Sequence, residues 1–235
     1  NQNKGAKEFF GFDTDKDSAY HFDATKFGLW LKDHYCKPKG VKHILEDIET
    51  IEQDEDGIVS LNKKHKADLY IDCTGWKSML LGGALKVPFQ PIQNLPNNKA
   101  WATRIPYNNR EKQLRPFTNC TALENGWSWN IPLWSRIGTG YVHCDKFVDK
   151  ETALKEFKTH LTKTWGGDVE SLEYRYIDMR CGIHERLFEK NVVAIGLAAG
   201  FIEPLESNGL FSVHEFLIEL VRNLRRGEIT QWDRD

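Results

Sequence analysis

The sequence predicts an α/β protein that combines a mostly parallel core sheet with an antiparallel layer. A short apolar run, residues 69–71, is closed by a polar loop, as expected for a buried strand. Residues 192–195 form a second apolar run, which ends at Gly196 before a helix. Between these two runs, residues 88–145 contain several short stretches in which aromatic and polar side chains alternate, which indicates an antiparallel layer.

Three helices follow from the spacing of apolar residues. Residues 23–35 and 152–165 each repeat apolar side chains near a period of 3.6, and Asp23 is a good N-cap for the first helix. A third helix begins near Gly209 and closes with two arginines and a glycine at positions 225–227. Basic residues in the last turn and a glycine beyond it are the usual end of a helix.

The first half of the chain adds a strand, a hairpin and an irregular segment. A strand is expected over residues 41–48. Residues 49–53 and 58–61 flank an Asp-Gly pair that is typical of a hairpin turn. Residues 88–96 are rich in proline, which favours an irregular backbone.

Composition restricts the classes of function. The net charge of -2 gives no reason to expect nucleic acid or an acidic membrane as a partner, and no run reaches the roughly 20 apolar residues of a membrane span. The five cysteines are scattered without a CxxC pair, and the eight histidines show no spacing typical of metal ligands. We therefore expect a cytoplasmic protein with reduced thiols and no metal site.

The loop after residues 192–195 carries most of the recognisable chemistry. Ligands in α/β sheets bind beyond the carboxyl ends of strands, and small residues here let a ligand approach the backbone. Ser207 or Asn208 can cap the following helix, whose free N–H groups can hold an anion. Glu206 precedes that turn. A carboxylate beside an anion site either works as an acid, a base or an orienting group, or merely caps the helix.

Trp127, Trp129 and Ile131 would point to one face of a strand. Two neighbouring indoles on one face can belong to an apolar core, or they can line a rigid passage for small species. Their spacing alone leaves both interpretations open.

These two segments resemble one enzyme family. Trp127-Ser128-Trp129-Asn130-Ile131-Pro132 is similar to the WxWxIP motif of flavin-dependent halogenases of the tryptophan halogenase group. Residues 194–207, which include Glu203-Pro204-Leu205-Glu206-Ser207, resemble the flavin and active-site segment of the same family. Residues 67–76 and 138–142 also fit its pattern, so the resemblance covers roughly residues 20–235.

The resemblance implies an FAD-dependent monooxygenase-type fold. It also implies an oxidoreductase of secondary metabolism that uses FAD as FADH2, O2 and a halide ion to make hypohalous acid. That acid halogenates an electron-rich aromatic substrate of the indole, phenol or pyrrole type. A separate flavin reductase would supply the FADH2, and a homo-oligomer is left open.

The resemblance also implies roles for individual residues. Trp127 and Trp129 would line the tunnel between flavin and substrate and keep the organic substrate from the flavin. Glu206 would be catalytic, either orienting the halogenating species or accepting a proton from the substrate ring. The remaining roles are flavin contacts at Ile48, Leu197 and Leu210 and a halide site at Asn208 and Gly209.

The chain departs from the family pattern in two ways. Asn208 stands where the family usually has threonine, which changes the size and donor type of the halide pocket. We therefore expect a larger halide, bromide or iodide, to be accepted. The chain also lacks the GxGxxG unit, the essential lysine and the helical C-terminal region of the family. We expect residues 1–235 to form an incomplete FAD-binding halogenase domain, and no lysine is nominated as catalytic.

Two other functions are compatible with these residues. A flavin-dependent aromatic hydroxylase of the same fold would keep the strand, loop and helix but would not need paired tryptophans. A non-catalytic flavin-binding remnant would explain the missing lysine and nucleotide-binding unit.

Overall fold

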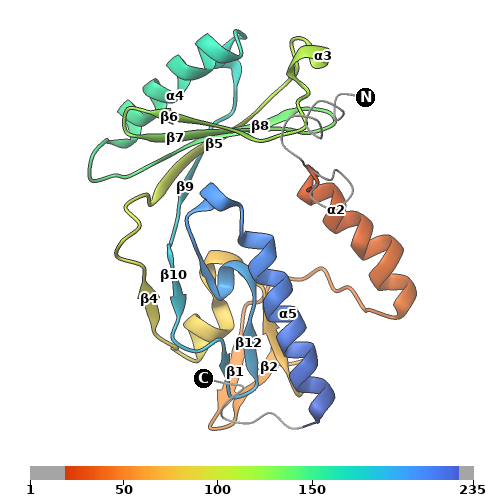
Figure 1. The fold of residues 1–235 in the computed structure, drawn as a ribbon. Coiled ribbons are helices and arrows are strands. Elements are labelled where there is room, and N and C mark those ends of the chain that lie inside the picture. Colours follow the sequence, from red (N-terminus) through yellow and green to blue (C-terminus); the bar gives the residue numbers. More distant parts are fainter. Residues whose placement is uncertain (1–18, 228–235) are drawn as a thin grey trace. The chain divides into compact units, whose positions relative to one another are not determined.

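The computed structural model describes residues 19–227, which divide into two compact units (Figure 1). The first unit comprises the chain up to Ile44 together with Lys99–Ile177. The second comprises Leu45–Asn98 and the chain from Asp178 onward. Each unit has its own buried apolar cluster, and each is described by itself.

The first unit is built on a five-stranded sheet with the order β6-β7-β8-β5-β9. Its strands are β5 (Lys99–Ile105), β6 (Asn119–Leu123), β7 (Gly126–Pro132), β8 (Ile137–His143) and β9 (Arg175–Asp178). Neighbouring pairs among β6, β7, β8 and β5 run antiparallel. The antiparallel pairing predicted for this part of the chain is therefore confirmed.

Helix α4 (Lys150–Thr164) covers one face of this sheet (Figure 1). The Asp149 carboxylate caps it by accepting a hydrogen bond of 2.9 Å from the Thr152 amide. Ala153, Phe157 and Leu161 lie one helical turn apart and are buried against the sheet. The predicted helix at 152–165 is thus confirmed, and it begins two residues earlier.

On the opposite face of the sheet, the indole pair of β7 lies beside glycines of β8. In the register of β7 and β8, Trp129 lies opposite Gly140 and Ile131 lies opposite Gly138. A Cβ on Gly140 would overlap the Trp129 ring and approach the Trp101 carbonyl oxygen to 2.5 Å. Gly140 therefore leaves the space in which the Trp129 ring lies. The prediction that Trp127, Trp129 and Ile131 share a face is confirmed.

Short helices complete the first unit. Asp23 caps α2 (Ala24–Trp30), as predicted, by accepting from the Thr25 and Lys26 amides. Arg136, beside the end of β7, donates to the other Asp23 oxygen at 2.9 Å. The helix continues as η1 (Leu31–Cys36) and η2 (Lys37–Lys39), and the remaining elements are α3 (Arg110–Gln113) and η5 (Val169–Ser171).

The second unit contains one parallel strand pair among its described residues. β3 (Tyr70–Asp72) runs parallel to β12 (Val192–Ala194), and β11 (Phe188–Glu189) pairs antiparallel with β12. Beside them lies the predicted hairpin, β1 (Ile51–Asp54) and β2 (Gly57–Leu61), whose turn is closed by Asp54 accepting from two backbone amides. The expectation of a mostly parallel core sheet is therefore not confirmed in the described residues of this unit, where β12 has one parallel and one antiparallel neighbour.

A second three-stranded sheet and a long helix complete this unit. β10 (Gly182–His184) pairs antiparallel with both β4 (Phe89–Pro91) and β13 (Gly200–Phe201). Helix α5 (Gly209–Arg226) ends at Gly227, as predicted, and this glycine adopts a left-handed conformation. The short helical turns are η3 (Gly75–Lys77), η4 (Met79–Ala84), η6 (Gly196–Ala198) and η7 (Pro204–Glu206).

Two predictions about strands need correction. Residues 41–48 form no strand, because their backbone finds no partner strand among the described residues. Glu49 and Thr50 instead donate their amides to the side chain of Asn62. Residues 88–96 are not wholly irregular, because β4 pairs with β10. Proline is tolerated there since β4 lies at the edge of its sheet.

We predict that Phe157→Ala destabilises the protein by about 3–5 kcal/mol, because it removes a fully buried ring packed between Tyr141 and Tyr174. Chemical denaturation followed by tryptophan fluorescence measures the change. Lys155→Ala, an exposed position on the same helix, is the control and is expected to stay within about 0.5 kcal/mol. Equal effects of the two substitutions would show that the α4 interface is not a stability determinant.

We predict that Gly140→Ala costs about 1–3 kcal/mol and displaces the Trp129 ring, because the added methyl occupies the space of that ring. Gly138→Ala is the matched control on the same strand, since its Cβ meets nothing closer than 3.6 Å. Near-ultraviolet circular dichroism reports the Trp127–Trp129 pair, whose ring centroids are 6.1 Å apart. A Gly140→Ala spectrum that matches the Gly138→Ala spectrum contradicts the packing described here.

Candidate functional site

A mainly apolar pocket of about 400 Å³ lies in the second unit. Four of the residues singled out from the sequence line it together: Leu197 and Leu210, expected at the flavin, and Asn208 and Gly209, expected at the halide. The pocket volume is within the usual range for small-molecule sites. The fold thus brings the expected flavin and halide positions to one cavity.

The pocket follows the carboxyl end of strand β12. From there the chain passes through η6 and β13 and then turns through η7 into α5. Gly196 has a φ of +66°, a left-handed conformation that residues with a side chain rarely adopt. A Cβ on Gly200 would lie 2.5 Å from the Gly182 carbonyl oxygen. These glycines are therefore required by the close path of the backbone around the pocket.

The start of α5 forms the polar end of the pocket. Ser207 is left-handed, with a φ of 54°, and Asn208 occupies the N-cap position. Asn208 is therefore the N-cap residue, as predicted, although its side chain makes no capping hydrogen bond. The first-turn amides are therefore not capped by Asn208. A Cβ on Gly209 would meet no atom within 4 Å, so the backbone there is open to a ligand.

Glu203 and Glu206 lie on the turn that leads to α5. The Glu203 carboxylate accepts from the Leu205 amide at 2.9 Å and from the Asn97 side chain at 3.3 Å, so it stabilises the turn. Glu206 is the last residue of η7, two positions before the helix N-cap. The Glu206 side chain lies outside what the structure describes.

A buried carboxylate organises the loop behind the pocket. Asp72, at the carboxyl end of β3, is fully buried and accepts from the Leu80 and Leu81 amides at 2.8 and 2.9 Å. Burial, and secondarily the Asp72 charge, raises the pKa of the adjacent Cys73 thiol. Cys73 therefore remains protonated at neutral pH and is no candidate nucleophile.

The other residues expected at the site lie elsewhere. Ile48 belongs to the second unit but is not among the residues that line the pocket. Trp127 and Trp129 belong to the first unit, where both rings are half-buried rather than enclosed in a core. The indole pair is therefore not fully enclosed among the described residues, and its tunnel role stays a prediction.

Several lining residues were missed from the sequence. They are apolar side chains contributed by three strands or loops and by α5: Ile92, Ile183, Phe201, Ile202, Val213 and Phe216. In the pairing of β10 with β13, Gly182 lies opposite Phe201 and Gly200 lies opposite Ile183. These two glycines were the available sequence signal for the pocket wall, because glycine within a strand often marks a close approach of another backbone.

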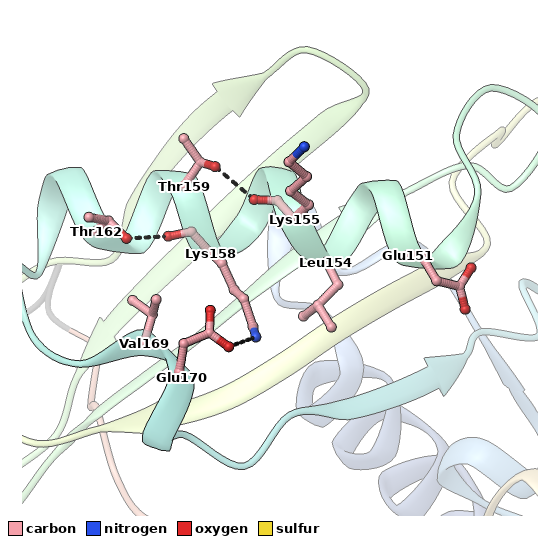
Figure 2. A pocket seen from close by; sticks show the side chains of 8 residues that line it. All are labelled: Glu151, Leu154, Lys155, Lys158, Thr159, Thr162, Val169 and Glu170. Atoms are coloured by element: carbon pink, nitrogen blue, oxygen red, sulfur yellow. Dashed lines mark hydrogen bonds and ion pairs between the residues drawn. The ribbon is translucent and has the colours of Figure 1, made fainter.

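A second pocket of about 420 Å³ lies on α4 in the first unit (Figure 2). Thr159 and Thr162 donate their hydroxyls to the carbonyl oxygens of Lys155 and Lys158, one helical turn back (Figure 2). Lys158 pairs with Glu170. Because these polar groups already satisfy one another, this pocket is a weaker candidate for a site than the pocket at the start of α5.

Residues 19–227 contain no helix that is long and apolar enough to cross a membrane.

Comparison with known proteins shows the family of the chain. A family model described as tryptophan halogenase matches residues 9–235. Tryptophan 6-halogenase SttH from Streptomyces toxytricini is 38% identical over 216 residues, which cover 89% of this chain and 40% of that protein. Tryptophan 7-halogenase RebH from Lentzea aerocolonigenes is 33% identical over 211 residues, which cover 87% of this chain and 39% of that protein.

Solved structures show the same relationship. The apo structure of VirX1 matches with a TM-score of 0.88 and 45% identity, covering 100% of this chain and 46% of that one. The crystal structure of SttH matches with a TM-score of 0.83 and 36% identity, covering 91% and 44%. The chain thus spans about 40% of the curated relatives' length. It belongs to the tryptophan halogenase family of flavin-dependent halogenases.

Proposed function

We propose that the full-length protein carrying this chain halogenates a small electron-rich aromatic compound, using FADH2, O2 and a halide ion. The observation that carries the proposal is the convergence of Leu197, Asn208, Gly209 and Leu210 on one apolar pocket at a helix N-terminus. Membership of the tryptophan halogenase family also supports it. A separate flavin reductase would supply FADH2, as the family resemblance implies.

The start of α5 is suited to hold the halide. The first-turn amides and the positive end of the helix dipole favour an anion, and no acidic side chain lies in the first turn. The open space at Gly209 lets an anion approach the backbone closely. Asn208 adds an amide donor at the same position.

The apolar remainder of the pocket is suited to a flat flavin ring. Leu197 and Leu210 are both more than a third exposed, so each has apolar surface available to pack on such a ring. FADH2, when bound, supplies the electrons that activate O2. The protein contributes a site with few polar groups, which limits competition from water for the halide.

The halogenation step needs a proton acceptor. When a substrate carbon forms a bond to the halogen of hypohalous acid, that carbon must lose its hydrogen as a proton, and water is the other product. We propose that the Glu206 carboxylate takes that proton or orients the hypohalous acid. Its position two residues before Asn208 places its backbone beside the proposed halide site.

Trp127 and Trp129 would separate the organic substrate from the flavin. Their half-buried rings form a rigid apolar surface on one face of the β7 strand. A surface of this kind can admit hypohalous acid and exclude an aromatic molecule. The proposal thereby accounts for two indoles that a hydroxylase would not require.

We predict that the full-length protein, supplied with reduced flavin, forms product only when a halide is present. Initial rates with bromide or iodide are expected to exceed those with chloride, because Asn208 changes the size and donors of the halide site. Asn208→Thr is expected to shift the preference toward chloride. A clear chloride preference of the unaltered protein would refute the halide assignment, and oxygenated product without halide would indicate a hydroxylase.

We predict that Glu206→Gln leaves FAD binding within about twofold and lowers the halogenation rate at least a hundredfold, in line with the loss of a general base. Steady-state rates and an FAD titration measure the two effects. Glu215→Gln, an exposed position on α5, is the control and is expected to retain full activity. Unchanged turnover in Glu206→Gln would remove this residue from the mechanism.

A further inference from the structure

One wall of the pocket is supported from behind by a second aromatic ring. Phe201 lines the pocket from β13 and is half-buried. The ring of Trp76 meets it edge to face, with centroids 5.0 Å apart and an interplanar angle of 81°. Trp76 is not among the lining residues, so any influence on the pocket is indirect, and Phe201 is the lining residue that its ring contacts.

The loop that carries Trp76 is fixed at its first end. Thr74 donates both its amide and its hydroxyl to the buried Asp72 carboxylate, at 3.0 and 2.6 Å. The same hydroxyl oxygen accepts from the Met79 amide at 2.8 Å. Thr74 is therefore held from both sides, and η3, which contains Trp76, follows directly.

The other end of the loop is fixed to the pocket wall. Ser78 is fully buried, with a φ of 41°, and donates its hydroxyl to the Ala198 carbonyl oxygen at 2.9 Å. It also accepts from the Gly82 amide at 3.1 Å. Ala198 belongs to η6, next to the pocket residue Leu197. The loop is thus fixed on both sides of Trp76, to Asp72 before it and to the pocket wall after it, which makes the ring a fixed support.

We propose that Trp76 is a positioning residue, which holds Phe201 in place and so sets how closely the pocket fits the flavin ring. This inference rests on the proposed function, because it takes the flavin as the ligand of the pocket. Without the indole, Phe201 would gain rotamer freedom and the wall would recede. An edge-to-face pair of this kind corresponds to about a two- to tenfold change in affinity.

The test uses FAD titrations of the full-length protein, followed by fluorescence. Trp76→Leu is expected to raise the dissociation constant about two- to tenfold, whereas Trp76→Phe, which retains a ring, should stay near the unaltered value. Trp134→Leu is the control, because that exposed indole packs on Arg110 in the first unit. An unchanged dissociation constant in Trp76→Leu overturns the inference.

A double-mutant cycle shows whether Trp76 acts through Phe201. In a Phe201→Leu background, Trp76→Leu is expected to cause little further loss of FAD affinity. Fully additive losses overturn the inference, because they mean that Trp76 acts by another route. Trp76→Met, which keeps apolar bulk without a ring, replaces Trp76→Leu in the cycle if the leucine variant does not fold.

The titration also separates this inference from the proposed function. If the unaltered protein binds no FAD, the proposed function fails at its cofactor. If it binds FAD and gives halide-dependent product while the cycle is additive, the proposed function stands and the role of Trp76 is refuted.

Discussion

The second unit depends on the buried carboxylate of Asp72. A charge without water must be compensated by hydrogen bonds, and four donors reach this one, from Thr74, Leu80 and Leu81. Its own carbonyl oxygen accepts from the Ile195 amide, which continues the pairing of the two parallel strands. One residue therefore joins the strand pair, the loop behind the pocket and the next helical turn. Replacing this carboxylate by an apolar side chain would leave all three without a common anchor.

Local signals in the sequence were sufficient for most elements. Asp23 and Gly227 end their helices as predicted, because capping depends on neighbouring backbone groups alone. The strand predicted at residues 41–48 was wrong because a strand forms only beside a partner strand, and β propensity carries no information about whether a partner is present. The Asn208 side chain left the helix uncapped although its type favours capping. The capping preference of asparagine is not realised here, where Asn208 lines the pocket.

Some of the residues that line the candidate site were predictable from the sequence, whereas the contacts that support the lining residues were not. Leu197 and Leu210 were placed by family resemblance, and the structure brings them to one cavity. The contact between Phe201 and Trp76 was not predicted, because it joins segments more than 120 positions apart in the chain. Tertiary contacts of this kind have no local pattern. The usable sign of a close aromatic contact was a glycine opposite an aromatic residue on paired strands. Gly182 with Phe201 and Gly140 with Trp129 both have this arrangement.

The pairing of Gly140 with Trp129 also has an evolutionary consequence. The indole occupies the volume that any side chain at position 140 would need, and the Trp101 carbonyl oxygen restricts the same position from the backbone. A smaller residue at 129 would remove the first obstacle but not the second. Position 140 should therefore remain glycine among related sequences even where 129 varies, whereas position 138 is free to accept a side chain.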